Sequence, residues 1–261
     1  MFLNIDVLEG IKNIPSNTID LIIADPPYYK IVKNYWDNQW NTEKEYTEWC
    51  ILWIKECERI LKDKGNFYLW GGIGGGLNKK KENNALLKLA LKISNETNFI
   101  RFNWITWKKD RGYGATKNWM FVREELLCYC LNYTEHYFNV QYSNEKRIGV
   151  KIDSFKSSYF KSPYKRCSNI WVLREVGDNN FEYDNHLHIA VKPILTSIRI
   201  IKSSCPKNGK VFIPFVGSGT DIIVCKKLQI KNPNLDYIGF EKDKLIYSNA
   251  NRRIENEIYV N

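Results

Sequence analysis

Four consecutive residues, Asp25, Pro26, Pro27 and Tyr28, combine a carboxylate, a rigid backbone and an aromatic ring directly after an apolar run. The two prolines fix φ and remove two N–H donors, so the carbonyls of this turn remain free to accept hydrogen bonds. A carboxylate and a free carbonyl can accept both protons of an amino group, while the ring can stack on a planar base. The four residues therefore predict a site for an amine carried on a flat heterocycle.

A second candidate site is the run from Phe215 to Thr220, which includes Gly217, Ser218 and Gly219 and stands between a strand-like and a helix-like segment. Two glycines at such a turn let a ligand approach the backbone, and the helix N-terminus favours negative charge. The structural alternative is an ordinary tight turn.

Two charged residues extend this second site. Glu241 ends the next strand-like segment, a place where an acid commonly binds the ribose hydroxyls of a nucleotide cofactor. Lys192 stands at the start of another helix, where the helix dipole disfavours a cation and a bound carboxylate would relieve the conflict. The structural alternatives are a helix cap for Glu241 and a solvent-facing side chain for Lys192.

The elements that position these residues alternate along the chain. The apolar pattern predicts strands at 4–6, 19–24, 66–70, 99–107, 125–131, 210–214 and 236–240, and helices at 7–13, 43–62, 82–94, 192–203, 218–229 and 243–256. This alternation indicates an α/β fold with a mostly parallel, twisted sheet that is covered on both faces. Residues 132–187 lack clean periodicity and are predicted to be an insertion rather than a separate domain.

Length and composition limit the class of protein. The chain has 261 residues and a net charge of +10, which suits a single domain that meets phosphate backbones, although lysine-rich composition alone could give this charge. The seven cysteines form no Cys-x-x-Cys pair, so we expect reduced thiols and no metal. No apolar run approaches ~20 residues and no leader precedes the first strand, so we expect a cytoplasmic protein without a membrane segment.

Two basic segments are candidates for contact with nucleic acid, with solvated lysine-rich loops as the alternative. Residues 141–166 interleave aromatic residues with cations, and residues 108–117 form a glycine-containing stretch that we expect to be a mobile loop. The candidate DNA-binding residues are Lys108, Arg111, Lys117, Lys146, Arg147, Lys151, Lys156, Lys161, Lys165 and Arg166.

The order of these motifs resembles the amino-directed DNA methyltransferases of the β class, in which the catalytic region comes first and the cofactor region last. The resemblance covers nearly the whole chain and also includes the segments 65–70, 103–109 and 188–193. It implies a Rossmann-like, three-layer αβα methyltransferase fold. Within one domain (1–261), residues 1–131 would form the catalytic half, 132–187 the target-recognition insertion and 188–261 the cofactor-binding half.

The resemblance also implies roles for single residues. Asp25 and the carbonyl of Pro26 would accept the two protons of the target amine, and Tyr28 would stack on a flipped base. S-adenosylmethionine would donate the methyl group, and its parts would be bound by a set of residues: Asp6 at the adenine, Glu241 at the ribose, Lys192 at the carboxylate, and Phe215, Gly217, Ser218, Gly219 and Thr220 along the methionine.

The aspartate that opens the catalytic motif favours N6-adenine as the target, because the cytosine enzymes of this class mostly have serine there. One departure is Ile213, which stands where the family usually places an aspartate. Two alternatives therefore stay open: an N4-cytosine methyltransferase and a catalytically impaired DNA-binding subunit. The partners expected from the resemblance are double-stranded DNA, a second copy of the chain and a cognate restriction endonuclease.

Overall fold

The computed structural model describes residues 1–31, 33–73, 83–115, 118–146, 162–174 and 191–259. The strands are β1 (Phe2–Asn4), β2 (Ile19–Ala24), β3 (Leu61–Gly71), β4 (Ile100–Ala115), β5 (Asn118–Cys130), β6 (Tyr142–Lys146), β7 (Tyr164–Arg166), β8 (Ile170–Val172), β9 (Lys210–Ile213) and β10 (Asp236–Glu241). The α-helices are α1 (Val7–Gly10), α2 (Glu43–Ile60), α3 (Ala85–Glu96), α4 (Ile194–Ser204), α5 (Thr220–Gln229) and α6 (Lys244–Tyr259), with 3₁₀ turns η1 (Ile11–Asn13) and η2 (Tyr35–Asn38).

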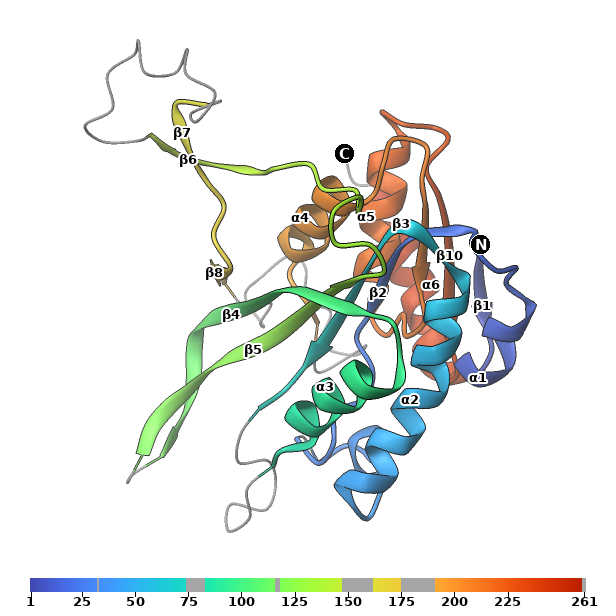
Figure 1. Cartoon of the computed structure of the whole chain (residues 1–261), viewed down its shortest axis with the longest axis vertical. Helices are drawn as coiled ribbons and strands as arrows, with labels where there is room; N and C mark the ends of the chain where they lie inside the picture. The colour runs from blue at the N-terminus through green and yellow to red at the C-terminus, as the bar shows by residue number, and fades with distance from the viewer. Residues whose placement is uncertain (32, 74–82, 116–117, 147–161, 175–190, 260–261) are drawn as a thin grey trace.

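Within the described residues, one eight-stranded sheet has the order β1-β10-β9-β2-β3-β5-β4-β8. The first five strands of this order are parallel, and β5 is antiparallel to both of its neighbours. Strand β8 closes the edge parallel to β4 (Figure 1). The predicted α/β architecture with a mostly parallel sheet is confirmed.

Helices cover both faces of this sheet, because its central strands are apolar on both sides. Along β2, Ile22 and Ala24 pack into the core beneath α1, α2 and α3. The alternating residues Leu21 and Ile23 pack into the core beneath α4, α5 and α6. A strand buried on both faces reads as one continuous apolar run, as this one does. The three-layer αβα arrangement expected from the sequence is therefore present (Figure 1).

The chain reverses its winding between β2 and β9, which are neighbours in the sheet. Strand β2 is followed by α2 on one face, whereas β9 is followed by α5 on the other face. Such a switch point opens a crevice outside the carboxyl ends of the strands, where ligands of open α/β sheets bind. The two candidate loops of the sequence follow these two strands.

The structure corrects two expectations. Residues 108–117 were expected to form a mobile loop, but β4 continues to Ala115 and pairs with β5, absorbing the glycines in shifts of the strand register. The insertion 132–187 contains three short strands, of which β6 and β7 form a separate ribbon and β8 joins the main sheet. Their short length and exposed side chains left no apolar periodicity to detect.

The predicted helices agree within a few residues, whereas β3 and β5 begin at Leu61 and Asn118, earlier than the predicted 66 and 125. The first strand lies at Phe2–Asn4 rather than 4–6, because the side chain of Asp6 caps α1 by accepting the N–H of Leu8. All seven cysteines are unpaired. Among the described residues, no helix is both long and apolar enough to span a membrane. In the same part of the chain, no group of three or more metal-binding side chains is arranged to hold an ion.

Candidate active site

The loop Asp25–Tyr28, called here the catalytic loop, lies beside the loop Phe215–Thr220, called here the glycine loop. In the parallel register, Ile22 pairs with Phe212. Asp25 and Phe215 each follow three residues later, so the two loops leave the sheet at the same level. The switch point between β2 and β9 therefore brings together the two motifs that the sequence analysis singled out.

Two donors hold the carboxylate of Asp25. The hydroxyl of Tyr28 donates to Oδ1 at 2.8 Å, and Nζ of Lys192 donates to Oδ2 at 2.7 Å. Lys192 is only 8% exposed, and its Nζ also pairs with Oε2 of Glu124 at 3.1 Å. Burial alone would lower the pKa of Lys192, but the charges of Asp25 and Glu124 outweigh it and raise the pKa. Lys192 therefore stays cationic beside Asp25.

The aromatic ring of Tyr28 lies within this charged cluster. Nζ of Lys192 lies 5.4 Å from the centre of the ring, and the hydroxyl of Tyr28 also donates to Glu124 at 3.2 Å. Burial, followed by the charges of Asp25 and Glu124, raises the pKa of Tyr28 well above its usual value. The phenol consequently stays protonated and acts as a hydrogen-bond donor.

Hydrogen bonds from the segment that follows the catalytic loop hold the backbone of the loop in place. The buried carboxylate of Asp37, 3% exposed, accepts the backbone N–H of Tyr28 at 2.8 Å. The carbonyl of Asp37 accepts the N–H of Lys30, and the amide of Asn83 donates to the carbonyl of Tyr29. These bonds fix the backbone of the loop, since a turn with two prolines has few donors of its own. Sequence analysis missed Asp37, which lies in a segment without periodicity.

The glycine loop has the backbone shape that its sequence requires. Gly217 and Gly219 have φ of 53° and 89°, a region that other residues rarely adopt. Arg253 of α6 lies beneath the loop, donating to the carbonyl of Ser218 at 3.1 Å and to Oγ1 of Thr220 at 2.9 Å. This buried arginine holds the loop against α6 and is a second residue that sequence analysis missed.

Two acids complete the same edge of the sheet. Oε2 of Glu241 accepts the N–H of Gly217 at 3.0 Å, and Oε1 accepts the N–H of Asp243 at 2.9 Å. Burial raises the pKa of Glu241, against the effect of these two N–H groups. Asp6 lies close to Glu241, because Asn4, two residues before Asp6, pairs with Glu241 across the strands. Oδ2 of Asp6 forms an ion pair with Lys242 at 3.0 Å.

These residues fit a nucleotide-like cofactor at the glycine loop. The side chains of Ser218 and Thr220 are buried, and Oγ of Ser218 lies 3.2 Å from Oγ1 of Thr220. A ligand at this loop would therefore meet mainly its backbone. The Phe215 ring packs on Trp53 and Trp49. Ile213 is fully buried in the core beneath α4, α5 and α6, so an aspartate at this position would lose its hydration.

A further acid, Asp221 in the first turn of α5, was not singled out by the sequence. Burial and the charge of Asp25 raise its pKa to about 6, against a hydrogen bond from Ser197 and the charge of Lys192. The charges of Asp25 and Lys192 therefore influence the pKa of Asp221.

The candidate DNA-binding residues are divided between separate parts of the molecule. Lys108 on β4 is exposed, as are Lys165 and Arg166 on β7. Arg111 and Lys146 lie in β4 and β6, and only their backbone is described. Lys117, Arg147, Lys151, Lys156 and Lys161 lie outside the described residues.

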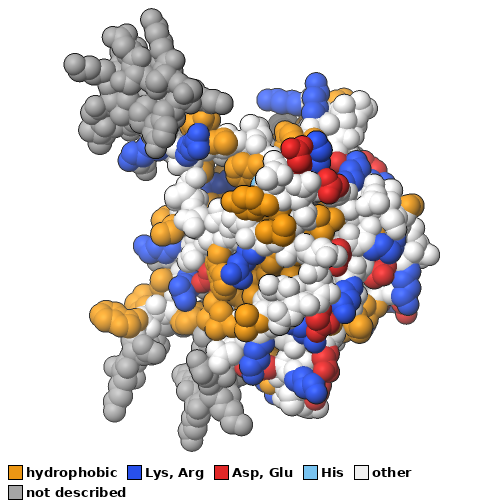
Figure 2. All heavy atoms as spheres, in the orientation of Figure 1, with side chains coloured by type: hydrophobic (Ala, Val, Ile, Leu, Met, Phe, Trp, Pro, Cys, Tyr) orange, Lys and Arg blue, Asp and Glu red, His pale blue; other side chains and the backbone are white. Residues whose placement is uncertain are grey.

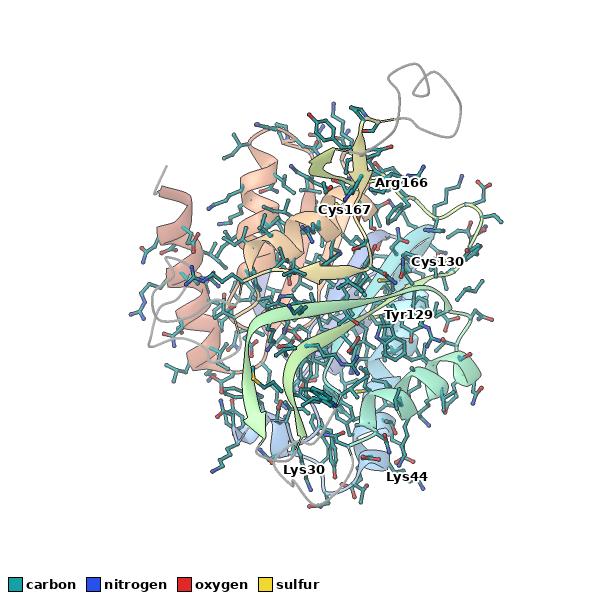
Figure 3. All side chains as sticks on the ribbon, turned by 90° about the vertical axis from the view of Figure 1, so that its left-hand side faces the viewer. Lys30, Lys44, Tyr129, Cys130, Arg166 and Cys167 are labelled. Atoms are coloured by element: carbon teal, nitrogen blue, oxygen red, sulfur yellow. The ribbon has the colours of Figure 1, made fainter. Side chains whose placement is uncertain are left out.

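The two basic segments do not share one end of the molecule. Figure 3 shows Arg166 at the opposite end from Lys30, which follows the catalytic loop. The β4–β5 hairpin, in contrast, points toward the end of the molecule where β3 finishes (Figure 1). The hairpin is therefore better placed than β7 to meet DNA at the catalytic loop.

A cavity of about 190 Å³ opens at a different place, between α4 and strands β3, β4 and β5. Arg166, Arg199 and the rings of Phe102 and Trp171 belong to its wall. No residue of the catalytic loop or the glycine loop lines it, so its size does not mark the site of the chemistry.

Glu124, which contacts Tyr28 and Lys192, is a further residue that sequence analysis missed. A signal was available: the charged run Arg123-Glu124-Glu125 interrupts an otherwise apolar strand. This run alone does not identify the partners of Glu124, because Tyr28 and Lys192 are far from it in sequence and are brought to it by the fold.

The chain is similar in sequence to known proteins. Residues 19–252 match the family model described as DNA methylase. The chain is 30% identical over 259 residues to the type II methyltransferase M.HpaI of Haemophilus parainfluenzae, covering 97% of this chain and 73% of that protein. It is also 30% identical over 226 residues to the DNA adenine methyltransferase YhdJ of Escherichia coli K12, covering 82% and 70%.

Among solved structures, the PvuII DNA methyltransferase, named as cytosine-N4-specific, matches with a TM-score of 0.74 at 15% identity, covering 98% of this chain and 89% of that one. The fold and the paired loops define a methyltransferase of the αβα type. The chain belongs to the DNA methylase family and is a DNA methyltransferase.

Proposed function

We propose that this protein transfers a methyl group from S-adenosylmethionine to the N6 amine of adenine in double-stranded DNA. The observation that carries the proposal is the carboxylate of Asp25, held by Tyr28 and Lys192 beyond the carboxyl end of β2, next to the end of β9. The aspartate at the first position of the motif and the similarity to an adenine enzyme, YhdJ, both favour adenine over cytosine.

The target base must leave the duplex before an enzyme can reach its amine, at a cost of a few kcal/mol. Stacking on an aromatic side chain recovers on the order of 1–3 kcal/mol, and Tyr28 of the catalytic loop is the ring placed to provide it. Because its hydroxyl is bonded to Asp25, the ring has a fixed position relative to the carboxylate.

The exocyclic nitrogen is a poor nucleophile, because its lone pair is conjugated into the ring. Asp25 accepts a hydrogen bond from one N–H of the amine and the carbonyl of Pro26 accepts one from the other N–H, which favours the tetrahedral nitrogen of the transition state. The acceptors are oriented before the substrate arrives, since Lys192 and Tyr28 fix Asp25 and Asp37 fixes the backbone. This is preorganised electrostatic stabilisation, and no residue forms a covalent bond to the base.

The cofactor would lie along the glycine loop, with the ribose hydroxyls at Glu241 and the adenine near Asp6. When bound, it supplies a methyl group on a sulfonium, which is a strong electrophile. Phe215 and the backbone from Gly217 to Gly219 would hold its amino-acid part. Nζ of Lys192 pairs with Asp25 and Glu124, so this lysine serves the catalytic loop as well as any cofactor carboxylate.

Two partners belong to the same proposal. The resemblance stated above implies a cognate restriction endonuclease, and the similarity to the type II methyltransferase M.HpaI supports this partner. A second copy of the chain, forming a homodimer, is the other partner proposed from the resemblance.

The experiment is to express the protein in a host that lacks adenine methylation and to sequence its modified bases across the genome. We expect N6-methyladenine at one short sequence, and none when Asp25→Ala is expressed. N4-methylcytosine at that sequence would favour the alternative target, and unmodified DNA would remove the proposed activity.

A further inference from the structure

Glu124 lies where the β4–β5 hairpin meets the catalytic loop. Its side chain is 16% exposed, and both carboxylate oxygens have partners. Oε2 accepts the hydroxyl of Tyr28 at 3.2 Å and pairs with Lys192 at 3.1 Å, while Oε1 pairs with Lys109 at 2.5 Å. The same two groups, Tyr28 and Lys192, hold Asp25. Tyr28 and Lys192 thus contact both Glu124 and the Asp25 carboxylate.

The cluster is balanced in charge. Burial alone would raise the pKa of Glu124, but Lys192 and Lys109 outweigh it and lower the pKa to about 2. Glu124 and Asp25 therefore offset Lys192 and Lys109. A half-buried site of this kind screens charges poorly, so the loss of one partner changes the potential at its neighbours.

Methyl transfer to an amine builds positive charge on the nitrogen. With Glu124 present, two anions face two cations when this charge develops. Without it, the two lysines leave an excess positive charge next to the reacting nitrogen, which raises the energy of the transition state more than that of the neutral bound base.

We propose that Glu124 is a positioning residue for methyl transfer: it holds Lys192 and Tyr28 against Asp25, and its charge balances the two lysines beside the target amine. The inference rests on the proposed function. It adds a residue of the hairpin to a site that the sequence had placed only in the catalytic and glycine loops.

The test compares Glu124→Gln with Glu125→Gln. Glu125 is the next residue of β5 and is also buried, but its Oε2 accepts from Trp104 and Thr106 rather than from the catalytic loop. Single-turnover methyl transfer is measured on a duplex carrying the sequence found in the genome, together with the dissociation constants of S-adenosylmethionine and DNA.

We expect Glu124→Gln to slow the single-turnover rate by about 10- to 100-fold, the size expected for the loss of a unit charge roughly 6–12 Å from the reacting nitrogen at an effective dielectric of ~20. Both dissociation constants should stay within about threefold of the parent, and Glu125→Gln should keep its rate. A Glu124→Gln rate equal to that of the parent, or a loss confined to binding, would overturn the inference.

A second variant tests the charge balance directly and does not depend on the fold of the single mutant. Glu124→Gln combined with Lys109→Gln removes one anion and one cation, so the double variant should recover part of the lost rate. No recovery, in a double variant whose circular dichroism matches the parent, would contradict the balance of charge. Absence of any methylated base from the wild-type protein would instead contradict the proposed function, so the two failures are distinguishable.

Discussion

Asp25 is held by side chains that come from three separate parts of the sequence. Tyr28 is local, Lys192 precedes α4, and Glu124 belongs to β5 and acts through the first two. These partners fix the orientation of the Asp25 carboxylate. Its position thus depends on residues that the motif itself does not contain.

Asp221 provides a prediction at this scale. Its pKa is raised to about 6, above its usual value of 3.8, first of all by burial. Between these two pH values the folded state binds more protons than the unfolded state, so the contribution of Asp221 to stability falls as pH rises from about 4 to 6 and stays low above. Asp221→Asn should therefore stabilise the protein at pH 7.5 by roughly 1–3 kcal/mol, measured by urea unfolding.

The pH dependence of that gain separates charge from packing. As the pH falls from 7.5 to 4.5, the advantage of Asp221→Asn over the parent should shrink, since the parent aspartate becomes neutral in the folded state. An equal gain at both pH values would show that the amide improves packing and that the carboxylate is not strained.

At the same scale, sequence could predict the residues of the two loops but not the roles of Glu124, Asp37 and Arg253. The motif residues are recognisable because a rigid turn or a glycine turn needs those residue types in consecutive positions. Glu124 and Arg253 act on partners far along the chain, and Asp37 acts on the nearby Tyr28 from a segment without periodicity. Only the fold brings such pairs together, so local pattern holds no information about them.

At the scale of elements, the switch point between β2 and β9 explains why two distant motifs lie side by side at one end of the sheet. Continuous apolar runs predicted β2 and β9 correctly, because a strand buried on both faces has no polar alternation. The hairpin was predicted only in part, as its outer half is exposed and contains glycines. There the antiparallel pairing, rather than local sequence, decides the structure.

The exposed end of the hairpin leads to a prediction. Trp119, Met120 and Phe121 are 91%, 57% and 43% exposed on β5, and Figure 2 shows apolar side chains gathered at this end. Exposed Lys108 and Arg123 face each other across the same hairpin. Apolar side chains flanked by cations suit insertion into DNA, so Trp119→Ala should weaken DNA binding by about tenfold, measured by fluorescence anisotropy.

A matched control for this variant is Leu91→Ala, because Leu91 is 66% exposed on α3, away from the hairpin. It should leave DNA affinity unchanged. If both substitutions weaken binding equally, or if Trp119→Ala changes only the oligomeric state, the hairpin is not a DNA-contacting element.

At the scale of the whole molecule, the net charge of +10 is spread over more than one surface. The β6–β7 ribbon with Arg166 and the segment after the catalytic loop lie at opposite ends of the long axis (Figures 1 and 3). Composition predicted a basic protein but not this separation, because charge counts carry no information about position. The exposed cations Lys108 and Arg166 thus lie on separate parts of the molecule.

Salt dependence tests how much of the binding is electrostatic. The logarithm of the DNA association constant should fall linearly with the logarithm of salt concentration, with a slope of about −3 or steeper. Lys108→Gln should make this slope less steep by about 1, as expected for one lost phosphate contact. A flat dependence in the parent would count against the basic surfaces as a DNA interface.

The central claim is that the carboxylate of Asp25 accepts a hydrogen bond from the target amine during methyl transfer. The most direct measurement is the single-turnover methylation rate of Asp25→Asn, with the affinities for S-adenosylmethionine and DNA measured on the same preparation. An amide of the same shape keeps the packing but loses the charged acceptor. We predict a rate at least about 100-fold lower with both affinities within about threefold of the parent. A rate close to that of the parent would contradict the account.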